Sequence, residues 1–274
     1  MLFRMKKIIF ALFALVATTA FACKKSDPVP DQKKATVVLV HGAWQGAFAW
    51  APVMNKLQQQ GYTVVSVELP AHGDDQTPAA GLTLTSYRDK VLAAIRAQSA
   101  SQVVLVGHSL GGSVISAVAE AAPTKIAKLV YVAGFLPANQ QSALDLAQQD
   151  AQSLLGPALS FSPDGSLAIV NRSQLANLFC QDGTAAVQQQ VVAKYRDEPA
   201  APIAEKVTLS AANYGRVPKY YVRTLQDHVI SPALQDIMLR ATPVQKEYRI
   251  DSGHTPHLSK PDELSATLAE IVQL

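Results

Sequence analysis

Short runs of apolar, mostly β-branched residues recur along the chain and alternate with segments of helical spacing. The runs are typical of parallel strands that are buried on both faces. The intervening segments carry their apolar residues on one side, as amphipathic helices do. This alternation predicts an α/β fold with a mostly parallel, doubly wound sheet. The expected strands are 36–40, 62–68, 103–106, 128–132, 219–224 and 244–250, and the expected helices are 48–60, 84–97, 113–122, 232–241 and 261–272.

Residues 137–217 interrupt this alternation. The segment is rich in Gln and Ala, and its pattern is mostly helical, as in 142–155 and 184–195. It also carries many Leu, Val and Phe residues, which a solvated linker of this length would not have. We therefore predict a helical cap that is inserted into one domain spanning residues 35–274 and lies over its functional site.

The N-terminal region carries the signals of an exported protein. Residues 1–22 combine basic residues, a short apolar stretch and small residues before a cut, which is typical of a signal peptide. The apolar stretch is short for a membrane span, although an N-terminal anchor helix is the alternative. Cys23 follows directly, as in the lipobox of bacterial lipoproteins, and residues 23–34 form a polar tether. We expect either a lipoprotein of the bacterial periplasm or outer membrane, attached through lipidated Cys23, or a secreted protein.

Charge and cysteine content narrow the class of partner. The chain of 274 residues has a formal net charge of +3, and several of its basic residues lie at the N-terminus. The remaining body is close to neutral and gives no reason to expect nucleic-acid binding. Only Cys23 and Cys180 are present, so we expect no disulfide, and we expect Cys180 to be a buried structural thiol. His72 and the nearby Asp74-Asp75 stretch could offer a pair of metal ligands, but no third ligand is obvious in the sequence, so no metal is expected. The oligomeric state stays open.

Residues 107–111, which read GHSLG, give the strongest chemical signal. They match G-x-S-x-G and lie between the strand expected at 103–106 and the helix expected at 113–122, the context of a nucleophile elbow. The small glycines allow the turn to hold Ser109 in a strained conformation. The N-terminus of the following helix favours negative charge. Ser109 is therefore the predicted nucleophile.

An activated serine needs a base, and the base needs a group that orients it. In a fold with this elbow the acid follows the serine in the chain and the histidine comes last. Asp227 follows a late strand, and His254 follows the last one. His257 is the competing base, but the glycine before His254 predicts a tight turn that aims the His254 side chain. Asp251 is the competing acid, but it ends the strand of the histidine itself.

The remaining parts of the site are expected from the first strand and the cap. The second oxyanion donor comes from the loop after the first strong strand in this kind of fold, which predicts the N–H groups of Ala43 and Leu110 as the donors. Trp44 borders this loop, and the cap supplies Phe161 and Phe179. We expect the three aromatic side chains to form an apolar pocket over the Ser109 hydroxyl.

Four stretches of the chain are familiar, and they read VLVHGAWQGAFAW, LPAHGDD, LVGHSLGG and GHTPHLSKPDEL. They resemble the plant methylesterase and hydroxynitrile lyase family of α/β-hydrolases and its bacterial esterase relatives. The likeness spans residues 35–132 and 219–274 and is poor in the cap. It implies an α/β-hydrolase fold, with Ser109, Asp227 and His254 as the triad and Ala43 and Leu110 as the oxyanion donors.

The resemblance implies one of two chemistries. The lyases of the family have a threonine in the first oxyanion loop and a lysine after the catalytic histidine, where this chain has Ala43 and Thr255. We therefore expect a serine hydrolase that cleaves small uncharged carboxylic esters through an acyl-enzyme, without cofactor or metal. The alternatives are a lyase-like cleavage of C–C bonds and a non-catalytic protein that binds a small ligand. The full set of Ser, Asp and His favours catalysis over binding alone.

Overall fold

A six-stranded sheet forms the centre of the computed structural model, which describes residues 34–274. Its strand order is β2-β1-β3-β4-β8-β9, and every neighbouring pair is parallel. The predicted α/β class with a doubly wound sheet is confirmed. The strands are β1 (Thr36–Val40), β2 (Thr63–Val67), β3 (Val103–His108), β4 (Ile126–Val132), β8 (Lys219–Thr224) and β9 (Lys246–Ile250).

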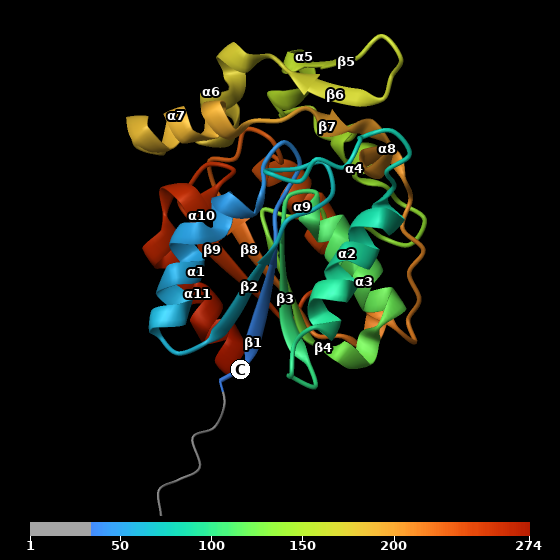
Figure 1. Cartoon of the computed structure of the whole chain (residues 1–274), viewed down its shortest axis with the longest axis vertical. Helices are drawn as coiled ribbons and strands as arrows, with labels where there is room; N and C mark the ends of the chain where they lie inside the picture. The colour runs from blue at the N-terminus through green and yellow to red at the C-terminus, as the bar shows by residue number, and fades with distance from the viewer. Residues whose placement is uncertain (1–33) are drawn as a thin grey trace, which may run out of the picture. The chain divides into compact units, whose positions relative to one another are not determined.

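Helices cover both faces of the sheet (Figure 1). Helices α2, α3 and α9 pack on one face, and α1 and α11 pack on the other. Successive residues of β1 point to opposite faces of the sheet. Val38 and Val40 therefore pack in the core on the side of α2, α3 and α9, while Val37 and Leu39 pack in the core on the side of α1 and α11. The helices are η1 (Ala47–Trp50), α1 (Ala51–Gln59), α2 (Leu84–Arg96), α3 (Gly111–Ala121), η2 (Pro123–Lys125), α9 (Pro232–Ala241), α10 (Pro256–Ser259) and α11 (Pro261–Gln273).

The chain between β4 and β8 forms a cap at the carboxyl ends of the strands (Figure 1). The cap contains several short helices, as predicted, and also an antiparallel three-stranded sheet, β5-β6-β7, which the sequence pattern did not predict. The helix expected at 142–155 is reduced to a single short one at its start. The cap elements are α4 (Ala143–Ala147), α5 (Leu155–Ala158), β5 (Leu159–Phe161), β6 (Leu167–Val170), η3 (Arg172–Gln174), α6 (Leu175–Phe179), α7 (Ala185–Lys194), β7 (Glu198–Pro199), α8 (Ala200–Ala204) and η4 (Tyr214–Arg216).

The predictions for the N-terminal region lie outside the described residues. They are the signal peptide at 1–22, the lipidation of Cys23 and nearly all of the tether. Within residues 34–274, which form one compact unit, no helix has the length and apolar character needed to cross a membrane.

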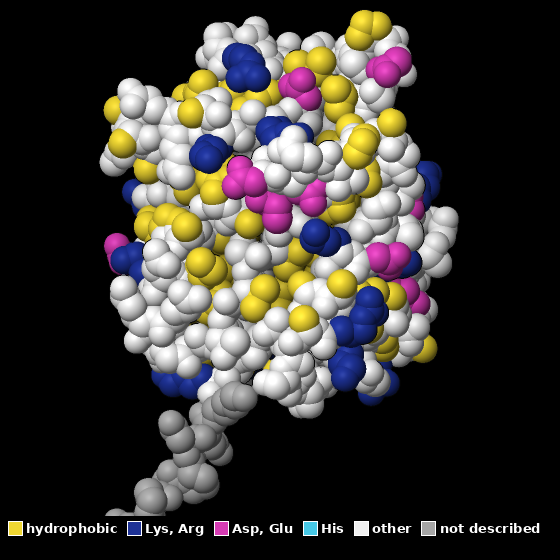
Figure 2. Space-filling model, viewed as in Figure 1, with side chains coloured by type: hydrophobic (Ala, Val, Ile, Leu, Met, Phe, Trp, Pro, Cys, Tyr) yellow, Lys and Arg dark blue, Asp and Glu magenta, His cyan; other side chains and the backbone are white. Residues whose placement is uncertain are grey.

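Cys180 is buried, as predicted, and burial raises the pKa of its thiol. On the face shown in Figure 2, acidic and basic side chains are interspersed.

Helix α3 begins in close contact with the backbone after β4. A Cβ atom added to Gly112 would overlap the carbonyl oxygen of Phe135, and the N–H of Phe135 donates to the carbonyl oxygen of Ser109 (3.0 Å). The backbone of Phe135 therefore contacts both the start of α3 and the turn that contains Ser109. Only glycine fits at this position of the helix.

We expect Gly112→Ala to lower the free energy of unfolding by about 1–3 kcal/mol, because the added methyl group has no room. Thermal and urea unfolding measure the change. Gly156→Ala in α5 is the matched control, since a Cβ atom there would meet nothing within 4 Å. It is expected to be neutral or stabilising by about 0.5–1 kcal/mol. Equal destabilisation by both substitutions would contradict this explanation.

Candidate active site

Ser109 lies in the turn between β3 and α3. Its φ angle is +52°, in the left-handed region that non-glycine residues rarely adopt. Its carbonyl oxygen accepts hydrogen bonds from the N–H groups of Gly112 (2.9 Å) and Phe135 (3.0 Å), which hold the turn in place. The residue is only 4% exposed. The structure thus has the strained strand–turn–helix arrangement that the sequence predicts around Ser109.

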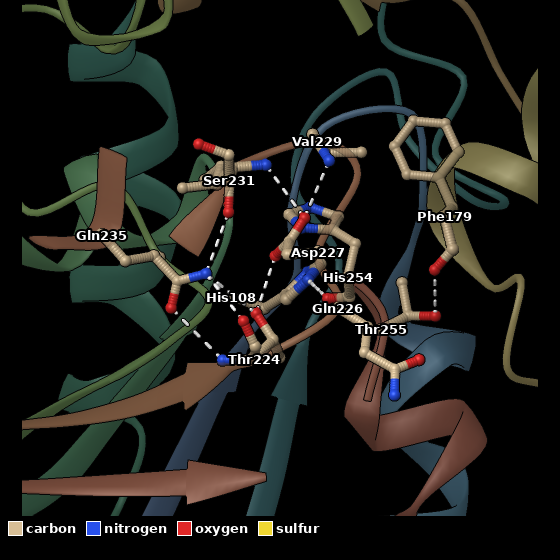
Figure 3. A network of polar contacts seen from close by, with 12 residues as sticks. His108, Phe179, Thr224, Gln226, Asp227, Val229, Ser231, Gln235, His254 and Thr255 are labelled. Carbon is tan, nitrogen blue, oxygen red and sulfur yellow. Dashed lines mark hydrogen bonds and ion pairs between the residues drawn. The ribbon is translucent and has the colours of Figure 1, made fainter. Parts of the chain in front are cut away.

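His254 and Asp227 form a buried hydrogen-bonded pair (Figure 3). Nδ1 of His254 lies 3.0 Å from Oδ1 and 2.9 Å from Oδ2 of Asp227. Because a carboxylate only accepts hydrogen bonds, the proton of the neutral imidazole is on Nδ1, and Nε2 has the free lone pair. Nε2 is buried and has no hydrogen-bond partner among residues 34–274. This nitrogen is therefore able to accept a proton from a hydroxyl group.

The loop after β8 fixes the carboxylate of Asp227 (Figure 3). Oδ1 accepts hydrogen bonds from the N–H groups of Val229 (2.8 Å) and Ile230 (2.9 Å). Oδ2 accepts one from the hydroxyl of Thr224 (2.7 Å), which in turn accepts one from Nε2 of Gln235 (3.1 Å). With these donors and the imidazole N–H, both oxygens are engaged, so the carboxylate has one defined orientation toward His254.

His108 and Phe179 contact His254 from other sides. Nε2–H of His108 donates to the carbonyl oxygen of His254 (2.8 Å), and burial lowers the pKa of His108 well below its usual value, so that this ring stays neutral. The ring centroid of Phe179 lies 6.0 Å from that of His254. The hydroxyl of Thr255 donates to the carbonyl oxygen of Phe179 (2.6 Å). Thr255, at the position of the family's lysine, therefore connects the histidine loop to the cap.

The loop after β1 brings Ala43 close to the serine turn. A Cβ atom on Gly42 would lie 2.6 Å from Cβ of Ser109, so only glycine allows the two backbones to approach this closely. Ala43 and Leu110 are both buried. Among the hydrogen bonds of residues 34–274, none engages the N–H of Ala43 or of Leu110. Two unengaged amides beside a serine are what an oxyanion hole requires.

Two of the three predicted pocket aromatics lie together at the site. The ring centroids of Trp44 and Phe179 are 5.7 Å apart, and both residues are buried. Phe161 in β5 is instead 56% exposed and lines a separate groove of about 490 Å³ together with Leu144 and Ile203. Neither Ser109 nor any other predicted triad residue lines that groove. The structure therefore does not bring Phe161 to the site, and we exclude it from the pocket.

The competing acid and base have other contacts. Asp251 is exposed and accepts a hydrogen bond from Nε2 of Gln226 (2.7 Å). His257 is buried with Nε2 3.3 Å from Oε1 of Gln45, and burial lowers the pKa of His257 to about 3. Neither residue contacts the Asp227–His254 pair through a hydrogen bond. In the part of the chain that the structure describes, no group of His, Cys, Asp or Glu is arranged to hold a metal ion.

Sequence reasoning missed Glu198, which forms a buried ion pair with His72. Nε2 of His72 lies 2.5 Å from Oε2 of Glu198, and Nδ1 lies 2.9 Å from the carbonyl oxygen of Pro70. Both ring nitrogens face acceptors, so the ring is doubly protonated. Burial alone would lower the pKa of His72, but the nearby carboxylate outweighs burial and the pKa is raised. The two partners are 126 positions apart in the chain, and no local pattern predicts their contact.

Comparisons with known proteins agree with this geometry. The sequence pattern of the alpha/beta hydrolase family matches residues 37–267. Putative methylesterase 11, chloroplastic, from Arabidopsis thaliana is 33% identical over 86% of this chain, which spans 64% of that protein's length. Methylesterase 7 of Arabidopsis thaliana is 30% identical over 88% of this chain and 96% of its own.

A solved structure shows the same fold. The crystal structure of polyneuridine aldehyde esterase matches with a TM-score of 0.78 and 21% identity, covering 87% of this chain and 99% of the other. The chain therefore belongs to the α/β-hydrolase family, in the group that includes the plant methylesterases.

Proposed function

We propose that the protein is a carboxylic ester hydrolase with Ser109 as nucleophile, His254 as general base and Asp227 as the group that orients the base. The observation that carries the proposal is the buried Asp227–His254 pair, in which Nδ1 faces the carboxylate and Nε2 has no hydrogen-bond partner among the described residues. The serine of the strained elbow is the hydroxyl that this nitrogen would serve. The similarity to methylesterases supports ester hydrolysis as the class of reaction.

The reaction follows from the roles of these groups. Ser109 Oγ attacks the ester carbonyl while its proton moves to Nε2 of His254, and Asp227 stabilises the imidazolium that forms. The negative oxygen of the tetrahedral intermediate accepts hydrogen bonds from the N–H groups of Ala43 and Leu110, each worth about 3–4 kcal/mol. The imidazolium gives its proton to the departing alcohol. Water then attacks the acyl carbon while its proton moves to His254, the bond to Ser109 Oγ breaks, and Oγ takes this proton back as the acid is released.

Two positions argue against a lyase-like reaction. Ala43 has no hydroxyl group to offer in the first oxyanion loop. Thr255 replaces the lysine of the lyases, and its hydroxyl donates to the carbonyl oxygen of Phe179. The residue directly after the base is not positively charged, so a departing anion such as cyanide would have no counter-ion at this position. Ester hydrolysis needs none.

Covalent labelling with a fluorophosphonate, combined with turnover of a chromogenic short-chain ester, tests the proposal. We expect one label per protein, on Ser109, with loss of hydrolysis in proportion to labelling. Label on another residue, or hydrolysis that survives full labelling, would refute the assignment. Absence of turnover together with a rise in Tm on adding small esters would favour a binding protein instead.

The surroundings of Ser109 favour small, uncharged, apolar esters. Ser109 and His254 are 4% and 1% exposed, so there is little open space at the nucleophile. The ring of Phe179, from the cap, lies beside the base, and the ring of Trp44 lies against that of Phe179. Aromatic walls of this kind hold apolar groups and give no counter-charge to a charged substrate.

We expect Phe179→Ala to lower kcat/KM for short apolar esters by about tenfold, because it removes an apolar contact worth 1–3 kcal/mol. The measurement is a kcat/KM series over acyl chain length and charge. Phe161→Ala is the matched control, since that ring lies in the separate groove, and we expect it to leave the series unchanged. A series that is flat for both variants, or a preference for anionic esters, would contradict the proposed pocket.

A further inference from the structure

Three hydrogen bonds connect Trp44 to the cap. Its backbone N–H donates to Oε2 of Glu198 (3.0 Å), and its indole N–H donates to the carbonyl oxygen of Ala168 in β6 (2.9 Å). Its carbonyl oxygen accepts from the N–H of Arg196 (3.3 Å). The residue that follows Ala43 is therefore held at its amide, its carbonyl and its side chain by one region of the cap.

Trp44 is also strained. Its φ angle is +60°, in the left-handed region, where a bulky side chain costs free energy. Such a conformation persists only when the surrounding contacts enforce it. The contact from Glu198 acts on the peptide group between Ala43 and Trp44. If it were lost, this peptide could rotate toward a relaxed conformation and move Ala43 with it.

Glu198 is placed for this task by the core. Its side chain is completely buried, and Oε1 accepts a hydrogen bond from the hydroxyl of Tyr87 (3.1 Å). Oε2 faces both the N–H of Trp44 and Nε2 of His72. One carboxylate of β7 thus joins the oxyanion loop, the loop after β2 and helix α2. An apolar group of similar volume is often at least as stabilising as a buried ion pair, so stability alone does not explain the charge.

We propose that Glu198 is a positioning residue for the reaction: it holds Trp44 so that the amide of Ala43 points at the developing oxyanion. The cap then shapes the oxyanion hole from behind, besides covering the substrate. The inference rests on the proposed function, because it takes Ala43 as an oxyanion donor. Glu198 does not touch the reacting atoms, so its effect is expected in kcat rather than in KM.

Glu198→Gln tests the proposal, because it keeps the size of the side chain but loses the charge and one acceptor oxygen. We expect kcat for a chromogenic short-chain ester to fall by about 10- to 100-fold with KM within about threefold, as for a displaced oxyanion donor. Glu205→Gln is the matched control. Glu205 is also a cap carboxylate that accepts a backbone N–H, that of Leu84 (2.7 Å), but it lies away from the oxyanion loop. We expect its kcat to stay at the wild-type value.

Tm is measured for both variants, so that a change in stability is separated from a change in rate. If Glu198→Gln does not fold, Tyr87→Phe replaces it, since it removes one hydrogen bond from the same carboxylate without touching Trp44. We expect it to lower kcat about threefold or more at unchanged KM. Wild-type kcat in the folded variant overturns the positioning role while leaving the triad intact. Activity that survives in Ser109→Ala overturns the proposed function itself.

Discussion

Ser109→Ala is expected to lower kcat for ester hydrolysis by about four to six orders of magnitude, because it removes the hydroxyl that attacks the carbonyl. His254→Ala is expected to lose as much. The double variant should be little worse than either single one, since the hydroxyl and the imidazole act as one unit. Initial rates with a chromogenic short-chain ester, at high enzyme concentration, measure all three.

His257→Gln is the control for His254→Ala. His257 is likewise a buried imidazole, but it faces Gln45 and packs against Trp50 in a tilted arrangement, with 4.6 Å between ring centroids. We expect its activity to stay within about threefold of wild type, because its pKa is too low and its contacts too remote from Asp227 for it to serve as base. If His257→Gln is inactive and His254→Ala is active, the base is assigned to the wrong histidine.

Asp227→Asn is expected to lower kcat by about four orders of magnitude while leaving the fold intact. The backbone donors of Val229 and Ile230 hold the carbonyl oxygen of the new amide at the place of Oδ1. The amide NH₂ then faces Nδ1 of His254, so that Nδ1 must accept a hydrogen bond and the proton moves to Nε2. The imidazole is then unable to take the serine proton.

The kcat of Asp251→Asn, measured under the same conditions, is the control for this test. Asp251→Asn changes an exposed carboxylate that is bonded only to Gln226 in the described chain, and we expect wild-type activity from it. Equal rates for Asp227→Asn and Asp251→Asn would show that the carboxylate does not orient the base.

The core elements are predictable because local signals mark their ends. Helix α9 begins at Pro232, after Ser231, whose hydroxyl accepts the N–H of Leu234 (3.2 Å), and it ends at Ala241 as the sequence predicts. Strand β8 also agrees with its prediction to the residue, since a run of β-formers precedes a polar loop. The order of the strands in the sheet is not marked by such local signals, because it depends on contacts between distant parts of the chain.

The cap and Glu198 escape such reasoning for the same reason. Strands β5 and β6 are short, and β6 gains its second partner only in β7, where Leu167 pairs with Pro199. The proposed triad is accessible to sequence reasoning because its order in the chain and its flanking strands are local features. Glu198, in contrast, contacts Trp44, which lies 154 positions away in the chain. From the sequence, an acidic residue before a proline is expected at the protein surface. Its role emerges only from burial and from its partners.

The insertion of the cap between neighbouring strands has a consequence for how such enzymes diverge. Strands β4 and β8 pair directly, from Leu129 with Lys219 to Val132 with Val222, so the segment between them adds no strand to the central sheet. Another segment can therefore connect the same two strands and alter substrate preference, provided that it replaces the cap side chains that pack in the core, such as Phe179 and Tyr214. It must also supply an acceptor for the amide of Trp44. A chimera that matches loop lengths but lacks this acceptor would inherit a well-formed scaffold and a poor catalyst.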